Sequence, residues 1–336
     1  MTVGELGEFG VVSRIAGRLS HGASVLLGPG DDAAVLAAPD QRVVVTTDLL
    51  LEGRHFRLDW SSGYEIGRKA AAQNLSDVIA MGATPTALFV GLGMPPDTTI
   101  AWLDALTDGF RDECALVGAS VAGGDIARSD TIVLGVTALG DLAGIAPITR
   151  SGARPGDQVA IAGRLGYAAA GLALLSAGKA TMEAGTATTG AGGARGETKG
   201  WVGGSFPELL LAHRRPEPPY DQGARAAALG ATAMVDVSDG LVQDLGHVAE
   251  ASGVGVVVEP ASFRVSAILV EAARYLGVDP LDWILTGGED HALAATFPPE
   301  VRLPPPWHVV GEVVQGQGVQ VKGRAEAPGG WDHFRG

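Results

Sequence analysis

The chain has 336 residues, of which 46% are hydrophobic and 18% charged, and its formal net charge is −14. This length is enough for two domains with hydrophobic cores, and this composition excludes an intrinsically disordered protein. The strong negative charge argues against nucleic acid or anionic membranes as partners.

The cysteine content and the hydropathy pattern are typical of a cytoplasmic protein. Cys114 is the only cysteine, so no disulfide can form within the chain, as is usual in a reducing compartment. The first ten residues lack the basic start and apolar run of a signal peptide, and no apolar run is long enough to span a membrane. We therefore expect a soluble protein in the cytoplasm.

In the first half of the chain, hydrophobic periodicity predicts strands alternating with helices. Strands are expected at 43–47, 86–92 and 131–139, and helices at 63–81 and 98–118. The polar, turn-rich stretch RSGARPGD that begins at Arg150 marks the predicted boundary between the domains. We expect an N-terminal domain at 1–149 and a C-terminal domain at 150–336.

The second half repeats the alternation. Residues 180–205 are rich in Gly, Ala and Thr and are predicted to form a flexible loop. The other expected elements are strands at 158–162, 231–235, 254–258, 290–297 and 307–314, and helices at 166–178, from about 240, and at 265–276. Both halves are therefore assigned to the α/β class.

Aspartates follow predicted strands at three places in the chain. The segments are VVVTTD at 43–48, AGGD at 122–125 and MVDVSDG at 234–240. A single aspartate in such a place usually caps a helix or closes a turn. The whole set comprises Asp31, Asp32, Asp48, Asp77, Asp125, Asp236 and Asp239.

Many carboxylates converging at one edge would repel one another unless cations lay between them. Oxygen ligands favour Mg²⁺ or Ca²⁺, and no Cys/His spacing suggests zinc. Protein-bound Mg²⁺ commonly binds phosphate as well, which suggests a nucleotide substrate. The chain lacks both the P-loop and the glycine-rich loop of protein kinases, so any kinase activity must belong to another class.

Motifs spread along nearly the whole chain resemble the thiamine-monophosphate kinase family. This family belongs to the superfamily of aminoimidazole ribonucleotide synthetase and selenophosphate synthetase. The matching segments, in family order, are GEFG (7–10), GPGDDAAV (28–35), TTDLLLEGRHF (46–56), NLSDVIAMGATP (74–85), GGD (123–125), TRSGARPGD (149–157), DVSDGLVQDLGH (236–247), GGED (287–290) and GWDHF (330–334).

The resemblance implies roles for individual side chains. Nucleotide contacts are implied for Gly124, Asp125, Arg150 and Ser238, and contacts to thiamine phosphate for His55, Glu289 and Trp331. The implied ligands of several Mg²⁺ ions are Asp32, Thr46, Thr47, Asp48, Asp77, Asp125, Asp236 and Asp239, with Asp48, Asp77 and Asp125 central to the metal-assisted reaction. The chain departs from the family where His291 and Ala292 replace an aromatic residue and an acid.

The resemblance also implies a reaction and an assembly. The γ-phosphate of ATP would pass directly to thiamine monophosphate, the last step of thiamine diphosphate biosynthesis, with Mg²⁺ in place of a general base. The N-terminal domain would pair with its copy in a homodimer with a barrel-like core. Two alternatives stay open: another ATP-using enzyme of the superfamily, or a non-catalytic nucleotide- or metal-binding protein.

Overall fold

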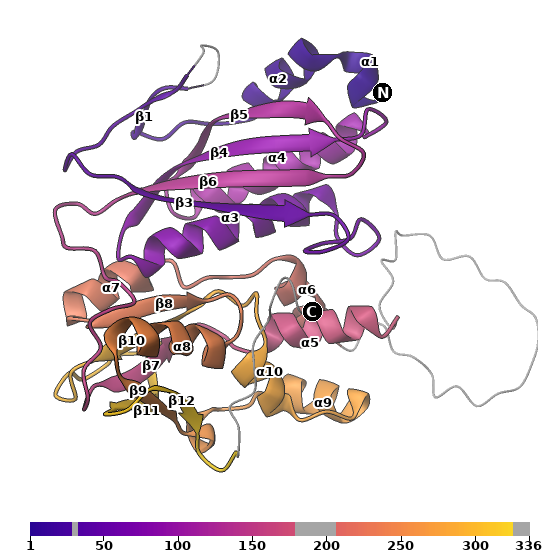
Figure 1. Ribbon diagram of the computed structural model, residues 1–336. Coiled ribbons are helices and arrows are strands. Elements are labelled where there is room, and N and C mark those ends of the chain that lie inside the picture. The colour runs from indigo at the N-terminus through magenta and orange to yellow at the C-terminus, as the bar shows by residue number, and fades with distance from the viewer. Residues whose placement is uncertain (29–32, 179–205, 325–336) are drawn as a thin grey trace, which may run out of the picture.

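The computed structural model describes residues 1–28, 33–178 and 206–324. Asp31, Asp32, Trp331 and the loop predicted at 180–205 lie outside the described residues. The described chain is built around two larger sheets, with helices packed on both (Figure 1).

The first sheet has four strands in the order β3-β6-β4-β5. Strand β6 pairs antiparallel with β3 and β4, whereas β4 and β5 are parallel. Its strands are β3 (Val44–Leu51), β4 (Thr84–Met94), β5 (Ser120–Arg128) and β6 (Val133–Asp141). A short antiparallel pair, β1 (Val25–Leu27) and β2 (Val35–Leu36), lies outside this sheet.

Helices α3 (Gly63–Ala80) and α4 (Ile100–Ala115) cover one face of the four-stranded sheet (Figure 1). A capping box starts α3: Ser62 Oγ accepts the N–H of Glu65, and Glu65 Oε2 accepts the N–H of Ser62. The short helices α1 (Val3–Leu6) and α2 (Glu8–Ala16) lie beside β5.

The opposite face of β3 carries exposed apolar side chains. Val45 retains 59% of its exposure and Leu49 retains 61%. Because side chains alternate along a strand, these two residues and Thr47 share the face that points away from α3.

The second sheet has six strands in the order β12-β9-β11-β7-β10-β8, all antiparallel to their neighbours except β12, which is parallel to β9. Its strands are β7 (Gln158–Ala162), β8 (Ala233–Val237), β9 (Gly255–Val258), β10 (Ala292–Phe297), β11 (His308–Val314) and β12 (Gly318–Val321). The helices of this half are α5 (Tyr167–Ser176), α6 (Pro207–Arg214), α7 (Gln222–Leu229), α8 (Leu241–Ser252), α9 (Ala267–Leu276) and α10 (Pro280–Thr286), with a 3₁₀ turn at Pro260–Ser262.

Helix α3 connects the two halves because it packs on both. Ile66 and Leu75 belong to the core of the four-stranded sheet, whereas Ile79 packs with Met234 and Leu293 of the six-stranded sheet. Helix α3 therefore lies where the two sheets meet (Figure 1). Among the described helices, none combines the length and hydrophobicity needed to cross a membrane.

Candidate active site

Strand β3 carries the predicted ligands Thr46, Thr47 and Asp48, but it does not end at them. It continues to Leu51, and Asp48 pairs with Val136 of β6 in the middle of the strand. The expectation that Asp48 terminates a strand is therefore wrong. Thr46 and Asp48 face α3, whereas the hydroxyl of Thr47 donates to the carbonyl oxygen of Val136 at 3.0 Å.

Helix α3 presents Asp77 to the same region. Thr46 Oγ1 donates to Asp77 Oδ2 at 2.7 Å, and Gln73 Nε2 donates to Asp48 Oδ2 at 3.0 Å. Burial, and then the nearby carboxylates of Asp236 and Asp48, raise the pKa of Asp77 to about 7. Asp48 and Asp236 therefore both lie close enough to act on the charge of Asp77, although the three residues come from separate elements.

Asp236 is buried near the end of β8. Ser76 Oγ of α3 donates to Asp236 Oδ2 at 3.0 Å, from a position 160 residues earlier in the chain. His291 Nδ1 lies 3.0 Å from the same oxygen; burial alone would lower the pKa of His291, but the hydrogen bond and charge of Asp236 raise it. Strand β8 includes Asp236 and ends one residue later, at Val237. The expected strand at 231–235 therefore ends two residues too early, although Asp236 does lie at the end of a strand.

The turn after β8 carries Asp239 and is closed by Asp244. Asp244 Oδ2 accepts the backbone N–H groups of Asp239 and Gly240, both at 3.1 Å. Burial, and then the charge of Asp236, raise the pKa of Asp244 to about 7. Asp244 is absent from the predicted site set, although it belongs to the matching segment 236–247. Its hydrogen bonds show a structural role in shaping the turn.

The side chains gathered here have the chemistry of a magnesium site. Asp48, Asp77 and Asp236 offer hard oxygen atoms. Burial, together with the nearby negative charges, raises the pKa of Asp77, and a bound cation would oppose this shift. In the part of the chain that the structure describes, no three Asp, Glu, His or Cys side chains form a ready-made metal-binding group. A bound ion would therefore have to draw these carboxylates closer together.

Asp125 does not join this acidic group within one chain. It is exposed on the edge strand β5, whereas Asp48 lies on β3 at the opposite edge of the same sheet. The two strands are about 14 Å apart, at roughly 4.8 Å for each strand spacing. Strand β5 also continues to Arg128, so Asp125 does not end it. The prediction that all these carboxylates converge at one edge is therefore wrong for Asp125 in a single chain.

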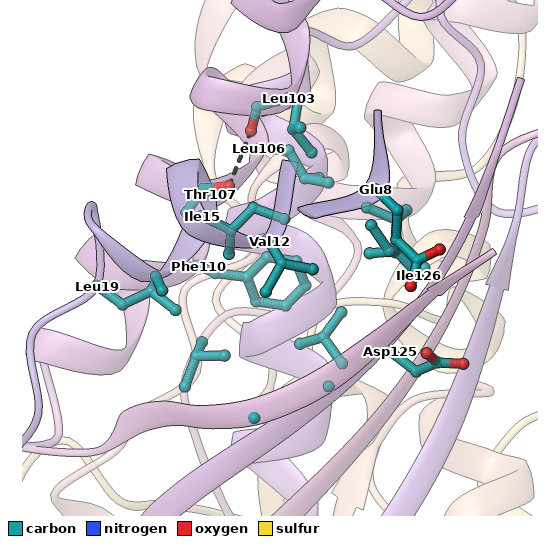
Figure 2. A pocket seen from close by; sticks show the side chains of 16 residues that line it. Glu8, Val12, Ile15, Leu19, Leu103, Leu106, Thr107, Phe110, Asp125 and Ile126 are labelled. Carbon is teal, nitrogen blue, oxygen red and sulfur yellow. Dashed lines mark hydrogen bonds between the residues drawn. The ribbon is translucent and has the colours of Figure 1, made fainter. Parts of the chain in front are cut away.

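Gly124 and Asp125 instead line a cavity of about 150 Å³ between α2, α4 and β5 (Figure 2). Its walls are mainly apolar, with Val12 from α2 and Phe110 from α4. The carboxylates of Glu8 and Asp125 lie on the same side of it (Figure 2). A small apolar cavity with a few polar groups at its margin suits a flat heterocycle such as a nucleotide base.

Glu289 lies in the turn between α10 and β10 and is held by two partners. Its Oε1 lies 2.8 Å from Lys69 Nζ, and its Oε2 lies 3.0 Å from His213 Nδ1. Burial alone would raise the pKa of Glu289, but Lys69 and then His213 outweigh burial and hold that pKa far below its usual value. Before it, Gly288 packs so closely on Ser238 that a Cβ would lie 2.3 Å from the Ser238 carbonyl oxygen.

The other predicted contact residues are distributed around this junction. His55 Nδ1 accepts the N–H of Leu51 at 3.0 Å, which places the proton of the neutral imidazole on Nε2. The carbonyl of Ser238 accepts the N–H of Glu289 at 2.8 Å, so these two residues are neighbours. Arg150 is exposed between β6 and β7, and its carbonyl accepts the hydroxyl of Ser252.

The two residues after Glu289 have clear structural partners. Asp290 accepts the backbone N–H groups of Gly166 and Ala168 at 2.5 and 2.8 Å, which caps the start of α5. Burial raises the pKa of Asp290 to about 7. His291, which departs from the family pattern, contacts Asp236 as described above. The departure therefore places an imidazole beside the acidic group.

The predicted site residues do not include Lys69, His213 or Asp244, and His291 appears among the sequence features only as a departure from the family. For Lys69 a clue exists: it lies three positions after Ile66 and directly before Ala70, on the apolar side of the predicted helix. A lysine on a buried helix face requires an acidic partner, because an unpaired buried charge is strongly unfavourable. The partners themselves come from distant parts of the chain and could not be identified from spacing.

Comparison with known proteins agrees with the resemblance. The family described as "AIR synthase related protein, N-terminal domain" matches residues 30–142. Thiamine-monophosphate kinase of Mycobacterium tuberculosis (strain CDC 1551 / Oshkosh) is 45% identical over 338 residues, which cover 99% of this chain and 93% of the relative. The enzyme of the same name from Corynebacterium glutamicum is 41% identical over 298 residues, covering 88% and 83%.

Two solved structures agree with the described fold. The crystal structure of thiamine-monophosphate kinase from Stenotrophomonas maltophilia K279a has a TM-score of 0.79 at 34% identity and covers 95% of this chain and 98% of that one. AaThiL complexed with AMPPCP and TMP has a TM-score of 0.76 at 31% identity and covers 99% of both chains. These similarities confirm the predicted α/β fold class. The chain belongs to the thiamine-monophosphate kinase family.

Proposed function

We propose that this chain transfers the γ-phosphate of ATP to thiamine monophosphate and so forms thiamine diphosphate and ADP. A phosphate oxygen of thiamine monophosphate attacks the γ-phosphorus, and the bond to the β-phosphate oxygen breaks. The observation that carries the proposal is the partly buried acidic group of Asp48, Asp77 and Asp236, in a chain that matches a relative of this family over 99% of its length. AaThiL, a neighbour in fold, was solved with AMPPCP and TMP.

The chain's acidic side chains would hold Mg²⁺ on this proposal. Asp48, Asp77 and Asp236 are the central ligands, and the other proposed ligands are Thr46, Thr47, Asp125, Asp239 and, outside the described residues, Asp32. Bound Mg²⁺ supplies charge neutralisation and orientation for the phosphates of both substrates. Because the attacking oxygen is already anionic, the chain needs no general base.

We propose that ATP lies across β5, with its base in the cavity lined by Gly124 and Asp125. The apolar walls around Val12 and Phe110 would exclude water from the faces of the base. Arg150 is exposed and offers a guanidinium group for a phosphate, and Ser238 offers a hydroxyl group near the acidic cluster.

We propose that thiamine monophosphate binds on the other side of the acidic group, between His55 and Glu289. Glu289 is ionised, which suits a ligand whose thiazolium ring carries a positive charge. His55, whose Nδ1 accepts the N–H of Leu51, is the other proposed contact to thiamine monophosphate. Trp331, outside the described residues, would stack on the cationic ring.

The enzyme is proposed to act as a cytoplasmic homodimer. The exposed apolar residues Val45 and Leu49 on β3 offer a sheet face for a second copy. We also propose a division at residue 150 into an N-terminal domain for ATP, Mg²⁺ and dimer contacts, and a C-terminal domain that completes the site.

The decisive experiment is to incubate the purified chain with ATP, Mg²⁺ and thiamine monophosphate and to separate the products by chromatography. We expect thiamine diphosphate and ADP in equal amounts, and no product when EDTA removes the metal. ADP formed without any need for thiamine monophosphate would favour another enzyme of the superfamily. Binding of ATP without any turnover would favour a non-catalytic binding protein.

A further inference from the structure

A buried lysine lies between two segments that bear proposed substrate contacts. Lys69 belongs to α3, and its side chain is only 3% exposed. Its ammonium group lies 2.8 Å from Glu289 Oε1 and donates to the carbonyl oxygens of His55 and His213 at 3.0 and 3.2 Å. These three contacts match the three donor hydrogens of a lysine.

Contacts from separate parts of the chain fix the position of the Lys69 ammonium group. The His55 carbonyl belongs to the segment after β3, and the His213 carbonyl belongs to α6 in the other half of the chain. A long, flexible lysine side chain normally loses considerable rotamer entropy when it is fixed, and here burial and two neutral acceptors already fix it. The ammonium group is therefore a rigid positive charge before any ligand binds.

Glu289 is fixed in turn, yet it remains accessible. Its second oxygen lies 3.0 Å from His213 Nδ1, its N–H donates to the carbonyl oxygen of Ser238, and its backbone φ of 66° lies in the left-handed region. A non-glycine residue in this conformation is disfavoured and commonly marks a functional site. The side chain of Glu289 nevertheless retains 29% of its exposure, so a ligand can reach it.

We propose that Lys69 is a positioning residue for substrate binding: anchored by the carbonyls of His55 and His213, it fixes the Glu289 carboxylate where the cationic ring of thiamine monophosphate is received. This inference rests on the proposed function and adds a residue to it. Lys69 itself does not contact the substrate; it acts through Glu289. A preformed anionic contact lowers the entropy lost on binding.

The test is a double-mutant cycle on substrate affinity. Wild type, Lys69→Met, Glu289→Gln and the double variant are compared for kcat and for the KM of thiamine monophosphate at saturating ATP and Mg²⁺. We expect Lys69→Met to raise this KM by about tenfold or more, in the range for loss of a contact to a charged group, with a much smaller change in kcat. Because Lys69 acts through Glu289, the double variant should have the same KM as Glu289→Gln alone.

Lys322→Met is the matched control, because Lys322 forms an exposed ion pair with Glu259 at 3.1 Å. Its KM should stay at the wild-type value. An unchanged KM in Lys69→Met, or a double variant with a KM well above that of Glu289→Gln, would overturn the inference. If Lys69→Met does not fold, the KM of the double variant is still compared with that of Glu289→Gln. A KM well above that of Glu289→Gln then overturns the inference. A wild type that makes no thiamine diphosphate would instead refute the proposed function, and this inference with it.

Discussion

Two groups of buried charge lie at the junction of the two sheets, and the chain balances them in opposite ways. Asp48, Asp77 and Asp236 bring like charges together, and the pKa of Asp77 is raised to about 7. Glu289 instead has Lys69 and His213 beside it, and its pKa is lowered. Helix α3 contributes a side chain to both groups. It supplies Asp77, a carboxylate that lacks a paired cation, and Lys69, the cation that pairs with Glu289.

The difference shows that Glu289 has its counter-charge before any ligand binds, whereas the clustered carboxylates of Asp48, Asp77 and Asp236 need an added cation. A carboxylate paired with a fixed ammonium group is ready to meet a cationic substrate, whereas clustered carboxylates become stable as anions only when a cation joins them. His291 beside Asp236 offsets part of this repulsion. Neutralising substitutions should therefore have opposite effects on the stability of the folded protein in the two groups.

The largest effect is expected from Asp48→Asn. Removing this charge should lower kcat for thiamine diphosphate formation by about 100- to 1,000-fold, as is usual when one electrostatic contact to a transition state is lost. The assay is initial rate by chromatography at saturating substrates. Asp97→Asn, an exposed aspartate in the loop after β4, is the control and should retain wild-type kcat. Equal rates in the two variants would remove Asp48 from the catalytic group.

Glu289→Gln should destabilise the protein, because it leaves the buried ammonium group of Lys69 without a counter-charge. We expect a loss of about 2 kcal/mol in the free energy of unfolding, below the value for fully buried pairs because Glu289 is partly exposed. Urea denaturation monitored by circular dichroism measures this loss. Glu259→Gln, which breaks the exposed pair with Lys322, should change stability by less than about 0.5 kcal/mol.

Asp77→Asn should have the opposite effect on stability in metal-free buffer. The pKa of Asp77 is about 7 in the folded protein and 3.8 in its reference state, so the folded chain binds the proton more tightly. Stability contributed by this group is therefore lost as pH rises from about 4 to about 7. Asp77→Asn removes that loss and should raise Tm at pH 8 by a few degrees.

Adding Mg²⁺ at pH 8 should reverse this order. The metal should raise the Tm of wild type more than that of Asp77→Asn, because it binds the folded carboxylates. Differential scanning calorimetry with EDTA and with Mg²⁺ gives all four values. A higher Tm for wild type than for Asp77→Asn in EDTA at pH 8 would contradict the like-charge description of this group.

The smallest change in the free energy of unfolding is expected from Asp244→Asn. This substitution tests a buried carboxylate whose hydrogen-bond partners are backbone N–H groups. Near pH 6, Asp244 with a pKa of about 7 is mostly neutral, and an asparagine side-chain oxygen can also accept from Asp239 or Gly240. We expect a stability change below about 1 kcal/mol at pH 6. The variant should gain stability relative to wild type as pH rises from about 4 to about 7, and this gain should level off above pH 7. A loss that grows with pH would show that the charged form of Asp244 is the favoured one.

Much of the fold could be predicted from the sequence because local patterns specify it. The helix expected at 63–81 is α3 at Gly63–Ala80, and the strand expected at 158–162 is β7 with the same bounds. The expected strand at 43–47 is too short, since β3 continues through Asp48 to Leu51. In the sequence, Asp48 looks like the residue that follows a strand, because the sequence does not show that Gln73 of α3 hydrogen-bonds to it in the middle of β3.

The sequence by itself determined the inventory of the site: the acidic residues and the motifs that resemble one family. The tertiary structure decided which of these residues meet. Ser76 reaches Asp236 across 160 positions, and Lys69 reaches Glu289, only because α3 packs between two sheets. The same arrangement places Asp48 and Asp125 on opposite edges of one sheet. Charge interactions depend on distance in space, and strand order and helix packing set that distance through contacts between remote parts of the chain.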